Sequence, residues 1–174
     1  MDTVLDMIVS FAAAGETSGL WPGMPGGEAD RLLGGETGLV SPGEQTASGP
    51  TGFKDGSLEV WASSAGRVEL VGFDADTEGK FRVPALGRAT TGQSSGPFTW
   101  EMVTNRLTAC ECVWSPDNAL TFDDQCSIRT KAGVSLGFRA PESSPDAPVQ
   151  AWLLEAVYRS FPEPLACADS EDAS

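Results

Sequence analysis

The sequence of 174 residues contains no histidine. Serine and cysteine enzymes of the common kinds use histidine as their general base, so Ser-His-Asp and Cys-His catalysis are excluded. The four cysteines lack the C-x-x-C spacing of a zinc knuckle, and no glycine-rich stretch ends in the Gly-Lys-Ser/Thr of a phosphate-binding loop. No catalytic motif is left, and we expect a protein that is not an enzyme and binds no cofactor.

Long apolar runs are also missing. No stretch approaches the ~18 consecutive apolar residues that cross a bilayer. The first helix-like segment carries Asp2 and Asp6 where a secretory leader would carry basic residues. We therefore expect a cytoplasmic chain with no membrane partner.

Basic residues are few: 11 lysines and arginines face 25 aspartates and glutamates, which gives a formal net charge of −14. A field of this sign attracts basic proteins and repels nucleic acids. The expected partner is therefore a basic protein, and no nucleic acid is expected to bind.

The clearest local pattern lies in residues 57–74. Apolar and polar positions alternate over 58–62, and a second alternating run covers 68–73, with Gly66 in the short connection. This pattern predicts a β-hairpin in which Val68, Leu70 and Gly72 share one face. Trp61 then lies on the face opposite Leu58, where either a helix covers it or a partner does.

Apolar spacing and turn residues predict the other elements. Helices are expected over 2–14, 25–33 and 99–108, strands over 52–54, 80–84, 109–114, 125–130 and 133–138, and loops over 36–52, 87–97 and 141–148. Residues 149–161 could form either a helix or a strand, and their valine, tryptophan and tyrosine favour a strand.

These elements predict an α+β fold with one domain over residues 1–161. Two similar helix-plus-antiparallel-sheet halves are expected at 19–86 and 97–161, because residues 53–60 echo residues 129–136. The acidic tail 162–174, rich in small residues, is expected to be disordered.

The predicted strand 109–114 places Cys110 and Cys112 on the same face. Buried free thiols are favoured here and for Cys167, while a bridge from Cys110 or Cys112 to Cys126 stays open in an oxidising compartment.

Two segments carry a resemblance. Residues 19–34, GLWPGMPGGEADRLLG, together with LEVWASSAGRVELVGFD, resemble small soluble actinobacterial proteins in which a helix and Leu-Leu-Gly precede a strand pair. Residues 120–129 and 133–138 resemble the second half of those proteins. Many of these proteins are encoded beside polymorphic toxins and are regarded as immunity proteins. The resemblance covers about residues 19–140, implies a binding function, and supplies no catalytic residues.

The predicted function is that of an immunity-type inhibitor that occludes a basic partner such as a toxin domain. We expect an electrostatic face with Trp61 as an aromatic anchor. The acidic residues assigned to this face are Glu59, Glu69, Asp74, Asp76, Asp123 and Asp124.

Two alternatives stay open. One is a small enzyme or metal-binding accessory protein that uses its acidic loops, namely Asp117 with Asp123 and Asp124, or the run from Asp74 to Glu78. The other is a nucleic-acid mimic, although apolar residues interrupt the acidic ones. No carboxylate pair stands out for glycosidase chemistry.

Overall fold

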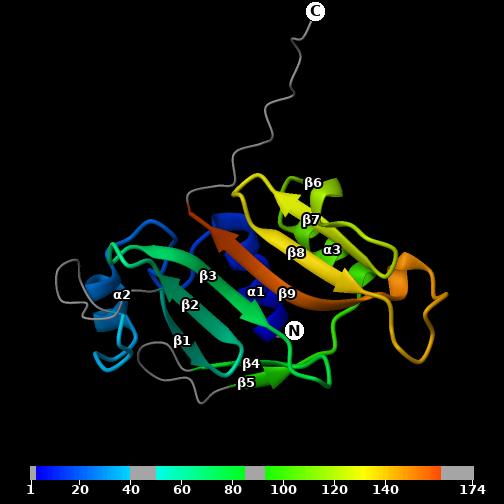
Figure 1. The fold of residues 1–174 in the computed structure, drawn as a ribbon. Helices are drawn as coiled ribbons and strands as arrows, with labels where there is room; N and C mark the ends of the chain where they lie inside the picture. Colours follow the sequence, from blue (N-terminus) through cyan, green and yellow to red (C-terminus); the bar gives the residue numbers. More distant parts are fainter. Residues whose placement is uncertain (1–2, 40–49, 85–92, 162–174) are drawn as a thin grey trace, which may run out of the picture.

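The computed structural model describes residues 3–39, 50–84 and 93–161, and its centre is a seven-stranded antiparallel sheet of order β1-β2-β3-β9-β8-β7-β6 (Figure 1). Its strands are β1 (Thr51–Asp55), β2 (Leu58–Ala62), β3 (Val68–Asp74), β6 (Trp114–Pro116), β7 (Gln125–Thr130), β8 (Ser135–Arg139) and β9 (Leu153–Ser160). The predicted α+β class is confirmed. The first three strands and the last four form two meanders, which the antiparallel pairing of β3 with β9 joins.

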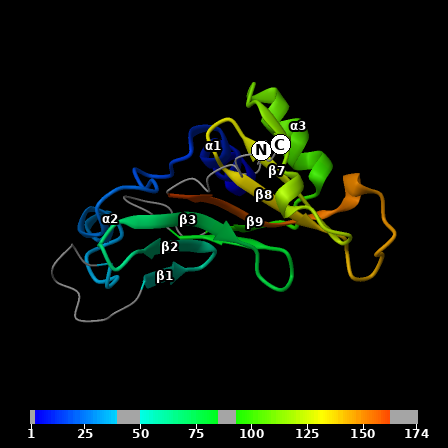
Figure 2. The same cartoon turned by 45° about the horizontal axis from the view of Figure 1, so that its top comes forward.

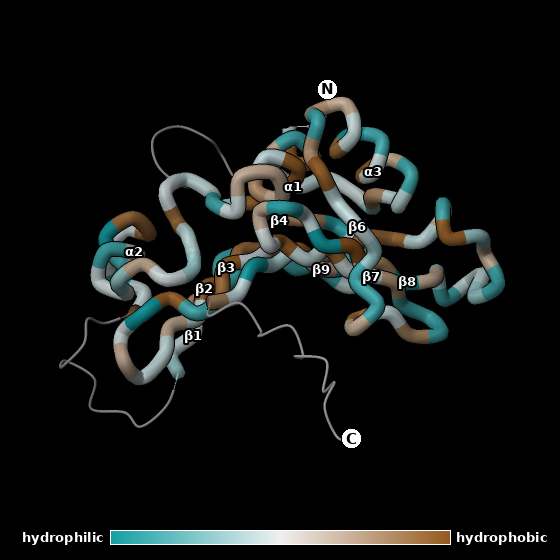
Figure 3. Tube along the Cα trace, turned by 90° about the horizontal axis from the view of Figure 1, so that it is seen from above, coloured by the Kyte–Doolittle hydropathy of each residue, from teal (hydrophilic) through white to brown (hydrophobic). Residues whose placement is uncertain are grey.

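Helices cover one face of this sheet. They are α1 (Thr3–Ala14) and α3 (Trp100–Ala109), and both lie on the same side of the strands in Figures 2 and 3. A shorter helix, α2 (Gly26–Leu32), lies at the β1–β3 end, where Gly26 N donates to Gly66 O. None of the described helices combines the length and apolar character of a membrane span.

The core lies between the sheet and these two helices. A cross-strand row of Leu58, Phe73, Val157, Leu136 and Ile128 is fully or almost fully buried. Phe73 meets Phe11 of α1 edge to face at 5.5 Å, and Phe138 meets Trp100 of α3 at 4.9 Å. The hydrophobic colouring of β2, β3 and β9 in Figure 3 follows this layer. We call this the inner face.

The helices begin and end as their sequences indicate. Thr99 caps α3 by accepting a hydrogen bond from Met102 N, as predicted. Pro25 stands at the N-cap of α2. Asp6 of α1 pairs with Arg106 of α3, whose Nη2 lies 2.6 Å from Asp6 Oδ1. This ion pair fixes the two helices side by side over the inner face.

The central hairpin forms as predicted, but its faces differ from the prediction. A register shift pairs Trp61 with Leu70 and Ala62 with Val68, which leaves Glu69 unpaired in the ladder. This β-bulge moves Val68 to the inner face with Val71 and Phe73, while Leu70 and Gly72 stay on the other side. A simple two-residue alternation in the sequence does not show where such an extra residue is inserted.

Two further predictions were wrong. Part of the expected loop 87–97 is strand β5 (Gln93–Ser95), which pairs with β4 (Phe81–Val83) in a separate two-stranded sheet. The expected strand 109–114 is the end of α3 followed by a turn, and only Trp114–Pro116 is extended. Residues 149–161 do contain a strand, β9, after a short 3-10 helix η2 (Val149–Ala151).

The positions of the cysteines also differ from the prediction, because α3 extends into the segment expected to be a strand. Cys110 and Cys112 lie at the C-terminus of α3, where Cys112 N donates to Leu107 O, and not on one face of a strand. The thiols of Cys110, Cys112 and Cys126 are free, but Cys110 is exposed, and Cys112 and Cys126 are half-buried instead of buried. Burial raises the pKa of the Cys126 thiol to about 11. Cys167, Asp2 and the tail 162–174 lie outside the described residues.

The similarity of the two halves is not confirmed and stays a prediction. Each half contributes a meander, but three strands come from the first and four from the second.

Replacing Gly72 with alanine is expected to lower the free energy of unfolding by about 2 kcal/mol. A Cβ at this position would lie 2.7 Å from Val157 O and 2.8 Å from Tyr158 Cβ, so the strands β3 and β9 would have to separate. Gly137→Ala on β8 is the matched control, because a Cβ there meets nothing within 4 Å. Urea unfolding of both variants checks this, and equal stabilities would contradict it.

Candidate protein-binding face

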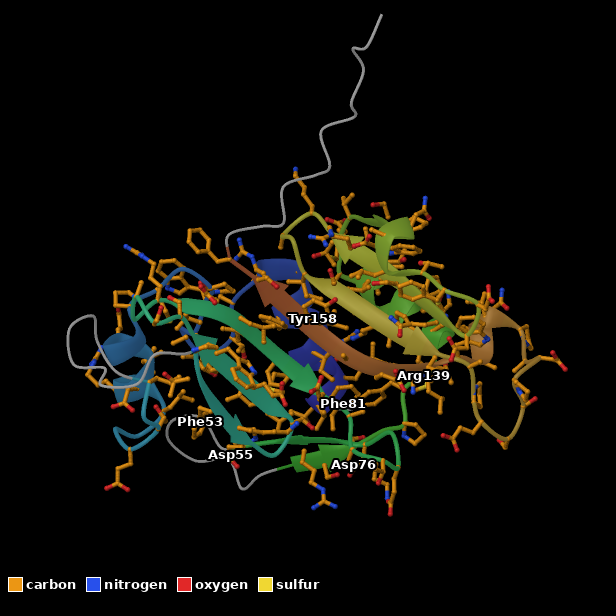
Figure 4. The ribbon with its side chains drawn as sticks, viewed as in Figure 1. Phe53, Asp55, Asp76, Phe81, Arg139 and Tyr158 are labelled. Atoms are coloured by element: carbon orange, nitrogen blue, oxygen red, sulfur yellow. The ribbon has the colours of Figure 1, made fainter. Side chains whose placement is uncertain are left out.

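The face of the large sheet turned away from α1 and α3 carries no described α-helix. We call it the outer face, and it is turned toward the viewer in Figures 1 and 4. Cross-strand pairing aligns one row of residues over it, since residues paired side by side share a face. The row runs Lys54, Glu59, Gly72, Tyr158, Ser135 and Arg129.

Three predicted residues meet on this face, around a lysine. Lys54 Nζ lies 2.5 Å from Glu59 Oε1 and 3.7 Å from Asp74 Oδ2. Trp61 follows two residues after Glu59 on the same face of β2, and its side chain contributes, after burial and Lys54, to the pKa of the Glu59 carboxyl. We call Lys54, Glu59, Trp61 and Asp74 the outer-face cluster.

The two carboxyl groups of the cluster have pKa values displaced in opposite directions. Burial, then the charge of Glu59 and a hydrogen bond with it, raise the pKa of Asp74 above its ordinary 3.8. Burial also opposes ionisation of Glu59, but hydrogen bonding and charge from Lys54 outweigh it, so the pKa of Glu59 falls below 4.5. The hydrogen bond to Glu59 raises the pKa of Lys54. Lys54 is therefore the cation for both carboxyl groups, and it lies closer to the carboxylate of Glu59 than to that of Asp74.

Asp74→Asn is expected to remove a pH-dependent loss of stability. Because its pKa is raised on folding, Asp74 binds its proton more tightly in the folded state than in the unfolded chain. Stability therefore falls as the pH rises through the range above 3.8. Urea unfolding from about pH 4 to about pH 7 should show the wild type losing stability relative to Asp74→Asn. A constant difference over that range would contradict this.

An acidic groove borders the outer face at the ends of β3 and β9. It has a volume of about 820 Å³ and lies between residues 74–79, residues 139–143 and residues 153–156. Five carboxylates and two cations line it: Asp74, Asp76, Glu78, Glu142 and Glu155, with Lys54 and Arg139. In Figure 4, Asp76 and Arg139 lie on this side of the sheet, beyond Tyr158. We call this the acidic groove.

Backbone hydrogen bonds hold the turn that forms one wall of the groove. Asp76 Oδ1 accepts from the backbone amides of Glu78 and Lys80, each at 2.9 Å. The hydrogen bond from Lys80, ahead of that from Glu78, keeps the pKa of Asp76 below its ordinary value. Arg139 Nε lies 3.3 Å from Glu155 Oε1 across the opposite wall. The groove is therefore formed by ordered turns.

A second hollow, of about 230 Å³, lies on the outer face beside Tyr158. Its other walls include Leu120 of the 3-10 helix η1 (Asn118–Leu120), Arg129 and Ser135. Burial raises the pKa of the Tyr158 hydroxyl. Arg129 Nε donates to Asp117 Oδ2 at 3.0 Å. Asp117, one of the acidic residues considered as a metal ligand, is therefore paired with an arginine.

The remaining predicted residues lie elsewhere. Glu69 is exposed in the β-bulge, where its carbonyl accepts from Phe161 N. Asp123 and Asp124 are exposed in the connection to β7, and Asp124 O accepts from Ala140 N, beside the acidic groove. Among residues 3–39, 50–84 and 93–161, no three His, Cys, Asp or Glu side chains form a group that could hold a metal ion.

Lys54 was not assigned to the site from the sequence, although a signal for it existed. Residues Gly56 and Ser57 form a two-residue hairpin connection, because Asp55 pairs with Leu58. Counting outward from that connection places Lys54 opposite Glu59. The positions of Arg139 and Glu155 had no such local signal, since the groove depends on the long-range pairing of β3 with β9.

Comparison with protein families, with curated proteins and with solved structures finds no match for this chain.

Proposed function

We propose that this protein is a non-enzymatic inhibitor of the immunity type, which occludes a basic protein partner such as a toxin domain and binds it through the outer face. The observation that carries the proposal is a sheet face that carries an exposed tryptophan and is bordered by the acidic groove. Trp61 is 43% exposed on this face, although strands β1 and β3 pair with β2 on either side of it.

Charge supports a basic partner. The groove holds more carboxylates than cations, and the whole chain has a net charge of −14. Opposite charge raises the rate of association, while a few aromatic side chains at the centre of an interface slow release. Tyr158 lies on β9, the middle strand of the sheet, and Trp61 lies on β2, toward one edge of the same face.

The form of the face supports a protein partner instead of a small ligand. Pockets for small molecules are enclosed and mostly apolar. Here the hollows are open ones at the borders of a broad sheet, and the larger one is lined mainly by charged and polar residues. The resemblance of residues 19–140 to immunity-type proteins points to the same class of partner.

The experiment that tests the proposal is capture of partners from the native cells with the tagged chain, followed by mass spectrometry, at low and moderate salt. We expect one stoichiometric basic protein, captured less as the salt concentration rises. Glu59→Gln combined with Asp74→Asn should capture less of it. The matched control is Glu28→Gln with Glu101→Gln, which removes the same charge from exposed residues of α2 and α3.

Absence of any basic protein from the wild-type capture would contradict the proposal. Equal capture by the two double variants would leave a partner but would remove it from the outer face.

A further inference from the structure

Trp61 is held as a flat platform on the sheet. A Cβ built on Gly52 would lie 2.8 to 2.9 Å from three consecutive carbons of the six-membered ring, Cε3, Cζ3 and Cη2. Near-equal distances to three adjacent ring atoms place Gly52 against the face of the ring and not against its edge. The indole therefore lies over strand β1, and its exposed fraction of 43% belongs to the side turned to solvent.

The carboxylates beside this platform already hold a cation. Glu59 lies two residues before Trp61 on the same face of β2, and Lys54 Nζ lies between Glu59 and Asp74. The Lys54 side chain is 56% exposed, and its contact with Asp74 is long at 3.7 Å. Lys54 reaches the pair from the neighbouring strand β1, and Trp61 keeps an exposed fraction of 43%.

We propose that the outer face binds an arginine side chain of the protein partner, stacked on Trp61 and paired with Glu59 and Asp74 in place of Lys54. This inference rests on the proposed function, which it deepens by naming the group that the partner inserts.

Arginine fits these contacts better than lysine. A guanidinium group is planar and stacks on an indole, and its five donors can serve two carboxylates at once. An ammonium group is a compact point charge, and Lys54 shows that it satisfies Glu59 closely and Asp74 only at a distance. A guanidinium in the place of Lys54 Nζ would be within reach of both carboxylates, because that one nitrogen lies 2.5 Å from Glu59 and 3.7 Å from Asp74.

The test uses two probes, N-acetylated hexa-arginine amide and hexalysine amide, titrated by calorimetry at low salt into the full chain. We expect the wild type to bind hexa-arginine about threefold more tightly than hexalysine, a cation–π contribution at an exposed site. Trp61→Leu should lose this preference. Trp21→Leu is the matched control, because Trp21 is 41% exposed and is not part of the outer-face cluster.

Two more variants test the displaced lysine and the platform. Lys54→Met removes the cation between Glu59 and Asp74, and this variant is expected to bind hexa-arginine about threefold more tightly than the wild type. Gly52→Ala pushes the indole off β1 while keeping every charge, and should reduce the arginine preference as Trp61→Leu does. Thermal unfolding of each variant confirms that it is folded.

The inference is overturned if Trp61→Leu keeps the arginine preference of the wild type, or if Lys54→Met binds hexa-arginine no better. Either result would leave a salt-dependent capture of a basic protein standing, so the proposed function would survive it. Failure to capture any basic protein would instead remove the proposed function, whatever the peptides show.

Discussion

Replacing Phe73 with alanine is expected to lower the free energy of unfolding by about 4 kcal/mol. Phe73 is 1% exposed, lies in the middle of the inner face, and meets Phe11 of α1 edge to face. Its loss removes the contact between β3 and α1 and leaves a cavity that the paired strands cannot close. Because small domains are stable by about 5–15 kcal/mol, the variant should lose a large fraction of its stability.

Phe122→Ala is the control for this prediction, because Phe122 is 62% exposed in the connection to β7. Chemical unfolding of both variants gives the comparison. A loss below about 1 kcal/mol for Phe73→Ala would contradict the packing of α1 on the sheet.

The second large effect concerns association with the partner. Glu59→Gln combined with Asp74→Asn is expected to slow association of the captured partner about tenfold at low salt, with a smaller effect on dissociation. These carboxyl groups are partly exposed on the outer face, so they act on the approaching partner through the long-range field before any direct contact forms. The difference should shrink in high salt, where charges more than a few ångströms apart are screened.

Surface-based kinetics with the Glu28→Gln and Glu101→Gln control measures this effect. A slowing of equal size in the control variant would assign the effect to net charge alone. A slowing that persists in high salt would contradict an electrostatic cause.

The elements that could be predicted from the sequence are those determined by local pattern. Alternation on both sides of residues 63–67 predicts the β2–β3 hairpin, and Thr99 predicts the start of α3. The β-bulge at Glu69 could not be predicted, because an inserted residue leaves the composition of the run unchanged. The end of α3 was missed for another reason: the cysteines, Val113 and Trp114 favour strands as single residues, while hydrogen bonds continue the helix to Ala109.

The residues of the candidate face can also be divided into those that local pattern predicts and those that depend on long-range pairing. Glu59, Trp61 and Asp74 were predicted from one hairpin, whose two strands bring them together. The groove was not predicted, because it needs β3 beside β9, two strands about eighty residues apart in the chain. Glu69, Asp123 and Asp124 were grouped with these residues on charge alone, and charge does not carry information about faces.

The measurement that tests the outer face most directly is site-specific photo-crosslinking to the captured partner. A benzoylphenylalanine in place of Trp61 reports on the outer face, and one in place of Met102 reports on α3, since the two residues are 43% and 45% exposed. We predict a crosslinked complex from position 61 and none from position 102. A crosslink from position 102 alone would contradict binding through the outer face.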